Sequence, residues 1–459
     1  MQRLFTLLIL PASVFAAPAS PNARHVLLDV QAAAAPVPAL KYQLLPEVGE
    51  MNPGNAVPAY LKCFFEQNNF FFKKESVDER ERLLICPLTD IKPGSLKGYG
   101  GNATTQADYA ARLEYCDWNI LPQMREKGYA LLLPDIQQMR MLPLALAVRC
   151  RGQLVDKDFD GAVHTLKTMF ALARHMGDHP TLISGLVGAA IGKIALNVLE
   201  ELIQQPGAPN LYWALTGMPT QLVDLRRAAS GERMLMEASF GTLMDIKRIW
   251  GPDDVADAMK KATEVGYYTF LAEEDRKAAE QWLRDRIRDE GWLKAARKSL
   301  AEAGYPVDKL DKYPPEQVVF YYLQRKSRIQ QDELLKWMNV PYWQAESALE
   351  ELTNDPIELE DKLTRSIVFR VAKVRAAHLR LEQRFALLRV VEAIRMDAAK
   401  NGGKLPVKLS DLISPLPNDP ATGKAFNYKI DGMTAILTGT PTKATAGNST
   451  HSYEVRLRK

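Results

Sequence analysis

The longest uninterrupted helical pattern in this chain, residues 357–400, constrains its fold more than any other feature. The pattern begins after the breaker pair Asp355–Pro356 and ends at Gly402 and Gly403. Mostly apolar side chains recur along it at three- and four-residue intervals, the spacing of one helix face. They are Val371, Val374, His378, Leu381, Phe385 and Leu388. A helix of this length is about 60 Å long and can brace a whole molecule. We therefore expect a mainly α-helical protein.

Three short segments after this helix alternate apolar and polar residues in the manner of β-strands. They are KAFNYKI (424–430), MTAILTGT (433–440) and SYEVRLRK (452–459). Asp431–Gly432 is a hairpin signal between the first two, and Asp419 to Gly423 predicts a turn. We expect the long helix to lead into a small three-stranded antiparallel β module, the two forming a domain over residues 357–459.

The β module resembles the globular end of the major pseudopilins of type II secretion systems. The matching residues are Gly403, Leu405, Pro406, Leu409, Leu412, Asp419, Pro420, Gly423, Phe426 and Tyr428. A pseudopilin begins with its hydrophobic helix, whereas here the helix is internal, so assembly into a fibre is not implied. The calcium loop of that family is acidic, whereas TGTPTKATAGNSTHS (438–452) contains no Asp or Glu. The resemblance implies a packing module without calcium.

The N-terminus has the features of a signal peptide over residues 1–19. Arg3 precedes an apolar stretch, and Ala16 ends a cleavage-site pattern. About 20 apolar residues are needed to span a bilayer, and this stretch is shorter. Residues 20–38 are rich in Ala and Pro and predict a flexible leader. We expect a periplasmic or secreted protein with no transmembrane segment after removal of the signal.

Residues 39–250 predict a domain of helical hairpins, and residues 251–356 a charged helical region. In the segment 151–180 a single apolar stripe repeats at helical spacing, and its Asp-Phe-x-x-Ala entry at Asp158 resembles half of a tetratricopeptide repeat. The segment 181–203 is apolar, and Gly188 and Gly192 form a small-residue pair. Since charges interrupt its apolar part, we interpret it as a buried helix and not as a membrane span.

Several motifs resemble binding sites, but each is better explained by helix structure. Asp156, Asp158 and Asp160 begin a calcium-loop pattern, yet Lys167 replaces its bidentate glutamate, so we expect aspartates that cap a helix. The remaining candidates are the histidines His164, His175 and His179, the GxGxxA match from Gly98 to Ala103, and the basic stretch 370–395. We predict no catalytic, cofactor-binding or metal-binding residues from these motifs.

The four cysteines allow two interpretations. Cys63, Cys86, Cys116 and Cys150 match no zinc-binding spacing. Export places them in an oxidising compartment, where two disulfides with three possible pairings are allowed. Buried free thiols are the equal alternative, and the sequence does not decide between them.

The chain also resembles a group of uncharacterised secreted proteins of planctomycete-type bacteria, through LKYQLLPEVGEMNPGNAVPAYLK (40–62), the hairpins and the C-terminal module. That resemblance implies an envelope or secreted location and no particular activity. We predict an exported, non-enzymatic helical scaffold that binds a protein or another envelope component of unknown identity, with no nucleic-acid ligand. The alternative is an envelope hydrolase whose site is assembled from residues distant in sequence.

Overall fold

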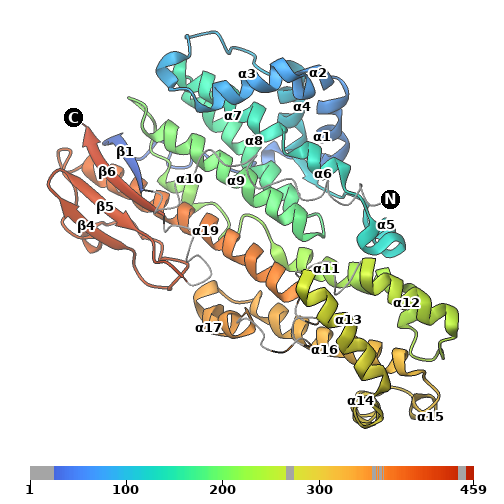
Figure 1. Ribbon diagram of the computed structural model, residues 1–459. Helices are drawn as coiled ribbons and strands as arrows, with labels where there is room; N and C mark the ends of the chain where they lie inside the picture. Colours follow the sequence, from blue (N-terminus) through green and yellow to red (C-terminus); the bar gives the residue numbers. More distant parts are fainter. Residues whose placement is uncertain are drawn as a thin grey trace. The chain divides into compact units, whose positions relative to one another are not determined.

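A computed structural model describes residues 25–264, 273–353, 358, 360, 364, 366–442 and 451–458 (Figure 1). The protein is mainly helical, with 62% helix and a small mixed sheet, so the predicted helical class is confirmed. The chain divides into two compact units. The sheet unit comprises segments 1–35, 203–212 and 383–459, and the helical unit comprises segments 36–202 and 213–382. Both units are discontinuous in sequence, whereas the predicted domains were consecutive. The predicted signal peptide lies outside the described residues.

The sheet unit contains a four-stranded mixed sheet in the order β1-β6-β5-β4 (Figure 1). Its strands are β1 (His25–Gln31), β4 (Asn427–Asp431), β5 (Thr434–Thr438) and β6 (Ser452–Arg458). Neighbours among β4, β5 and β6 are antiparallel, and β1 is parallel to β6, with His25 opposite Ser452. The sheet therefore has one strand more than the three-stranded antiparallel arrangement that we expected.

Strand β1 corrects the prediction that residues 20–38 are a flexible leader. The segment HVLLDVQ alternates, and its inward side chains Leu28 and Val30 are fully buried. Burial of these two branched apolar side chains, together with the pairing of β1 with β6, offsets the entropy that the segment loses on ordering. The partner strand β6 is more than 400 residues away, which is why the local composition of Ala and Pro concealed it.

The long predicted helix is α19 (Ser366–Ala398), whose residues from Gln383 onward belong to the sheet unit. It ends where predicted: Gly402 and Gly403 have φ values of 66° and 76°, and the Gly403 N–H bonds to the Ala398 carbonyl at 2.8 Å. Glycine reaches this left-handed conformation without the steric penalty of a Cβ. Val390 and Ile394 are fully buried in this part of the helix.

A fully buried ion pair on α19 fixes two other segments of the sheet unit. The Arg395 and Glu392 side chains are inaccessible to solvent and lie 2.6 Å apart. Arg395 also donates to the carbonyls of Gln31 (2.9 Å) and Ala208 (3.0 Å), and Glu392 accepts the Leu211 N–H at 2.6 Å. The pair therefore ties the end of β1 and the segment 208–211 to the helix.

The helical unit consists mainly of consecutive helices. Their bounds, with those that cross between the units included, are α1 (Ala56–Phe65), α2 (Asn68–Phe72), α3 (Lys74–Ile85), α4 (Gly101–Ala110), α5 (Leu121–Lys127), α6 (Pro134–Met139), α7 (Leu142–Val155), α8 (Phe159–Gly177), α9 (Leu182–Ile203), α10 (Tyr212–Thr216), α11 (Leu225–Phe240), α12 (Pro252–Glu264), α13 (Glu273–Arg288), α14 (Glu290–Glu302), α15 (Val307–Leu310), α16 (Pro315–Trp337) and α17 (Tyr342–Thr353). A short parallel pair, β2 (Asn52–Asn55) and β3 (Leu113–Tyr115), lies among them.

Helices α7 and α8 form a hairpin over the segment that resembles half of a tetratricopeptide repeat. The predicted stripe on α8 faces the core, since Leu166, Phe170 and Ala173 are fully buried. Its tetratricopeptide-like character stays a prediction.

Helix α9 is, among the described residues, the single helix long and apolar enough to cross a membrane, and 67% of its most apolar window is buried inside the protein. A Cβ added to Gly188 would lie 2.8 Å from the Ala173 carbonyl oxygen of α8, closer than such atoms normally approach. Glycine thus permits close packing of the two helices, as expected for a buried helix.

Candidate functional site

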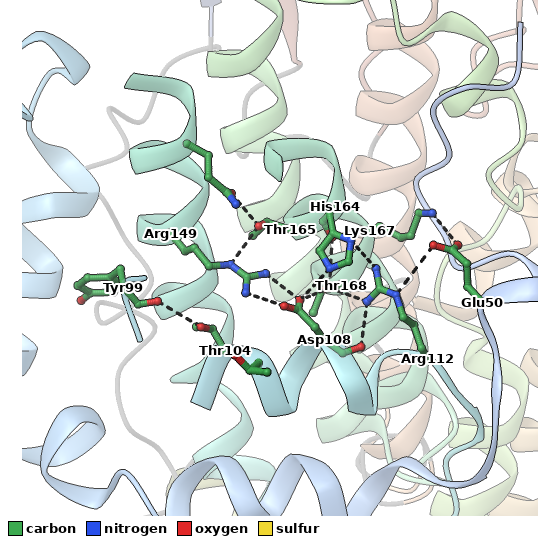
Figure 2. A network of polar contacts seen from close by, with 12 residues as sticks. Glu50, Tyr99, Thr104, Asp108, Arg112, Arg149, His164, Thr165, Lys167 and Thr168 are labelled. Atoms are coloured by element: carbon green, nitrogen blue, oxygen red, sulfur yellow. Dashed lines mark hydrogen bonds and ion pairs between the residues drawn. The ribbon is translucent and has the colours of Figure 1, made fainter. Parts of the chain in front are cut away.

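The most extensive polar network in the view of Figure 2 joins helices α4, α7 and α8 around Asp108. Arg149 of α7 donates two hydrogen bonds to the Asp108 carboxylate, at 2.7 and 2.8 Å. The Thr168 hydroxyl of α8 donates a third at 2.6 Å. Burial by itself raises the pKa of Asp108, but the contacts from His164, Arg149 and Thr168 outweigh it and hold that pKa well below its ordinary value.

The network extends through Arg112 to Glu50, which lies just before β2. Arg112 Nη2 lies 3.1 Å from His164 Nδ1, and Arg112 Nε lies 4.0 Å from Glu50. Lys167 forms a 2.6 Å ion pair with the same Glu50. Lys167, which replaced the expected calcium-binding glutamate, therefore has a structural ion-pair partner.

This arrangement braces three helices and does not form a hydroxyl, imidazole and carboxylate relay. In such a relay the imidazole accepts the proton of the hydroxyl. Here the Thr168 hydroxyl donates directly to Asp108, and His164 Nε2 lies 3.7 Å from the carboxylate. The positive charges of Arg149 and Arg112 offset the negative charges of Asp108 and Glu50. The network therefore stabilises the fold.

The three histidines singled out in the sequence have separate partners. His164 contacts Arg112, His175 Nδ1 lies 2.9 Å from the Tyr60 hydroxyl, and His179 Nδ1 lies 3.0 Å from the Thr181 hydroxyl. Burial lowers the pKa of both His175 and His179 to about 4. Across the described ranges, no group of three or more His, Cys, Asp or Glu side chains is placed to hold a metal ion.

The aspartates of the calcium-like motif point to three different partners. Asp158 caps α8 by accepting the Gly161 N–H at 2.9 Å, Asp156 accepts the Gly94 N–H at 2.7 Å, and Asp160 accepts the Tyr42 hydroxyl at 2.8 Å. The capping interpretation is confirmed for Asp158. The GxGxxA match lies at the start of α4 and follows a run of turns, so it lacks the preceding strand of a dinucleotide site.

At least two arginines of the basic stretch 370–395 are buried inside the protein. Arg375 is 2% exposed and pairs with Glu382 at 2.9 Å, and Arg395 pairs with Glu392 as described above. These two cations are neutralised inside the protein, so they are not offered to an anionic surface.

All four cysteines, Cys63, Cys86, Cys116 and Cys150, are free thiols, which decides the alternative that the sequence left open. Burial raises the pKa of the Cys63 thiol to about 12 and raises the pKa values of Cys116 and Cys150 well above the ordinary value. Since the thiolate is the reactive form, these three thiols are protected in the folded protein.

We expect iodoacetamide at pH 8 to leave these three buried cysteines largely unmodified in the native protein. After unfolding in urea without reductant, four adducts are expected, because no disulfide has to be opened. Intact-mass spectrometry counts the adducts. A protein that gains all four adducts only after reduction would contradict free thiols.

An open groove of about 280 Å³ on the helical unit is the strongest candidate for a binding site. We call it the arginine groove. It lies along α11 and α16 and includes residues near the end of α14. Its lining residues are Arg233, Met236, Glu237, Met244, Ala303, Tyr305, Gln324, Arg325, Arg328, Ile329 and Gln331.

The arginine groove combines positive charge with apolar side chains. Arg233 pairs with Asp332 at 2.5 Å, and Arg328 contacts both Asp332 and Glu237. Arg325 donates to the Ser299 hydroxyl at 3.1 Å and has no carboxylate partner within the described part of the chain. Three guanidinium groups thus share two carboxylates, leaving one positive charge available to a ligand.

The groove also presents polar and apolar groups that a partner could contact. Gln324 is 8% exposed, and its Nε2 has no hydrogen-bond partner among the described residues. Ile329 lines the groove and is 49% exposed, although it is a large apolar side chain. Sequence reasoning missed this site because its residues come from helices about 70 to 90 positions apart, and no local motif joins them.

No known protein family, curated protein or solved structure matches the chain. The resemblances to pseudopilins and to planctomycete-type secreted proteins therefore stay predictions.

Proposed function

We propose that this protein is an exported, non-enzymatic helical scaffold of the cell envelope that binds a partner protein through the arginine groove. The observation that carries the proposal is the excess guanidinium charge of Arg325 beside the exposed Ile329. Arginine recognises carboxylates in a fixed, often bidentate geometry, and exposed apolar side chains gain free energy on burial. The partner segment is expected to carry Asp or Glu next to an apolar residue.

The hydrolase alternative has weaker support. A hydrolase needs a nucleophile and a base that reach the same open space. His179 lines a cavity and contacts the Thr181 hydroxyl, but Thr181 is 1% exposed and is not among the residues that line that cavity.

A photo-crosslinking amino acid at Ile329 tests the proposal in intact cells. We expect it to capture one envelope protein in near-equal amount, identified by mass spectrometry. The matched control replaces Ile85 of α3, which is also apolar, is 77% exposed and does not line the groove. Capture from both positions alike, or from neither, would argue against a binding groove.

The charge of Arg325 provides the second arm of this test. We expect Arg325→Glu to reduce the crosslinked product at least about tenfold, because the variant replaces attraction with repulsion of a carboxylate. Arg325→Lys keeps the charge and should retain part of the product. Equal crosslinking by the Glu variant and the native protein would show that Arg325 does not contact the partner.

A further inference from the structure

A second cavity of the helical unit is larger than the arginine groove and has a different chemistry. We call it the Trp118 cavity, and its volume is about 510 Å³. Its lining residues are Trp118, Ile120, Gln123, Lys127, Ala130, Leu131, Leu132, Leu133, Pro134, Asp135, Ile136 and His179. Sites for small molecules usually measure about 300 to 1,000 Å³ and have mainly apolar walls. The volume of the Trp118 cavity lies in this range, and most of its lining residues are apolar, although polar and apolar atoms contribute about equally to the surface of its wall.

One apolar run that precedes and enters α6 contributes several residues to the wall. Leu131, Leu132, Leu133 and Pro134 are consecutive, and Leu132 is 64% exposed. Exposure of a leucine beside so much other apolar surface is unfavourable in water. A bound apolar molecule would remove that surface from solvent.

The buried His179 adds a neutral hydrogen-bonding group to this wall. Its ring meets the Trp118 ring edge to face, with centroids 5.6 Å apart, and its Nδ1 lies 3.0 Å from the Thr181 hydroxyl. His179 is 1% exposed, and burial lowers its pKa to about 4. At neutral pH the imidazole is therefore uncharged, with one nitrogen that donates and one that accepts.

The charges at the rim do not select an ionic ligand. Lys127 and Asp135 both line the cavity and are both exposed, and their charges are opposite. They contribute no net charge, in contrast to the arginine groove. An uncharged ligand avoids the cost of moving an ion against the leucine wall.

The loop that presents Trp118 is held in place before any ligand binds. The Asn55 amide brackets its neighbour Asp117, accepting the Asp117 N–H at 3.0 Å and donating to the Asp117 carbonyl at 2.7 Å. Asn119 has a φ of 47°, a left-handed conformation that asparagine tolerates better than most residues, and its N–H bonds to the Asp117 carboxylate at 2.9 Å. A pre-organised wall loses little entropy on binding.

We propose that the Trp118 cavity binds an uncharged, mainly apolar small molecule that carries a single hydrogen-bonding group for His179. Four observations support this proposal: the volume of the cavity, the exposure of Leu132 in its wall, the uncharged imidazole of His179, and the opposite charges of Lys127 and Asp135 at its rim. The proposal is independent of the scaffold function, because the cavity and the arginine groove share no lining residue.

The probe for this test is N-phenyl-1-naphthylamine, an uncharged aromatic molecule with one amine N–H whose fluorescence rises in apolar surroundings. Titration of the purified full-length protein is expected to give saturable binding with one site. Leu132→Glu should weaken it at least about tenfold, because the variant places a carboxylate in the apolar wall. Ile85→Glu adds the same charge at a position outside the cavity that is even more exposed, and it should leave the affinity unchanged.

Two further variants show whether the probe binds in the Trp118 cavity or elsewhere. Trp118→Phe should retain binding and lower the energy transfer from tryptophan to the probe, since the cavity would lose its own donor. Ile329→Glu alters the arginine groove and should have no effect. No saturable binding, equal affinities of the Leu132→Glu and Ile85→Glu variants, or loss of binding only in Ile329→Glu would each overturn the proposal. Circular dichroism establishes that each variant is folded.

Discussion

The three buried histidines of the helical unit are expected to lower its free energy of unfolding by about 6 kcal/mol when the pH falls from 7.5 to 5.0. Burial, together with nearby arginines, lowers the pKa of His175, His179 and His378 from the ordinary 6.5 to about 4. At a pH between these two pKa values the three imidazoles are protonated in the unfolded chain and neutral in the folded protein. The free energy of unfolding therefore falls as the pH falls, by about 2 kcal/mol for each histidine at pH 5.

This loss is large relative to the total stability of a typical domain, about 5 to 15 kcal/mol, so unfolding near pH 5 is expected. Urea unfolding, followed by circular dichroism at several pH values, measures it. His378→Gln removes one of the three groups and should reduce the pH-dependent loss by about a third. A free energy of unfolding that is the same at pH 7.5 and pH 5.0 would show that the three imidazoles are not buried in their neutral form.

Replacing Arg395 by methionine is expected to destabilise the sheet unit by about 3 to 5 kcal/mol. The substitution keeps an unbranched apolar stem but leaves the Glu392 carboxylate buried with no cation beside it. It also removes the donors to the carbonyls of Gln31 and Ala208. Hydrogen exchange should show that the amides of β1 lose protection first, since Arg395 anchors the end of that strand.

Arg389→Met is the matched control, because this arginine lies on the same helix. Its side chain is only partly buried, donates to the Pro415 carbonyl at 3.2 Å and lies over the Tyr212 ring. Its loss should cost about 1 kcal/mol. The double variant Glu392→Gln with Arg395→Met should recover part of the stability, because no uncompensated charge remains. Equal effects of the two arginine substitutions would contradict the role of Arg395.

Several features of this protein follow from residues that are neighbours in sequence. Gly402 and Gly403 end α19, Asp158 caps α8, and Asp431–Gly432 connects β4 to β5. Each depends on the conformational preference of one or two residues or on a hydrogen bond spanning a few positions. The sequence pattern alone therefore predicted them.

Prediction from the local sequence pattern fails for the buried arginines of α19. The arginines of the stretch 370–395 recur in the manner of a solvated helix face, yet Arg375 and Arg395 are almost completely buried. A buried arginine is stable only with a carboxylate and carbonyl oxygens around it. The carbonyls of Gln31 and Ala208 are supplied by segments that have no sequence relation to the helix, so the helical pattern could not reveal them.

The sequence by itself determined the helical class, the C-terminal end of the long helix, the position of the hairpin and the capping role of Asp158. Only the tertiary structure decided that β1 completes the sheet, that the cysteines are free, and that distant residues line the arginine groove and the Trp118 cavity. Local backbone preference is set by adjacent residues, whereas these features depend on which distant segments meet. That choice depends on the apolar surface that each contact buries and on the entropy lost in closing the chain between the segments.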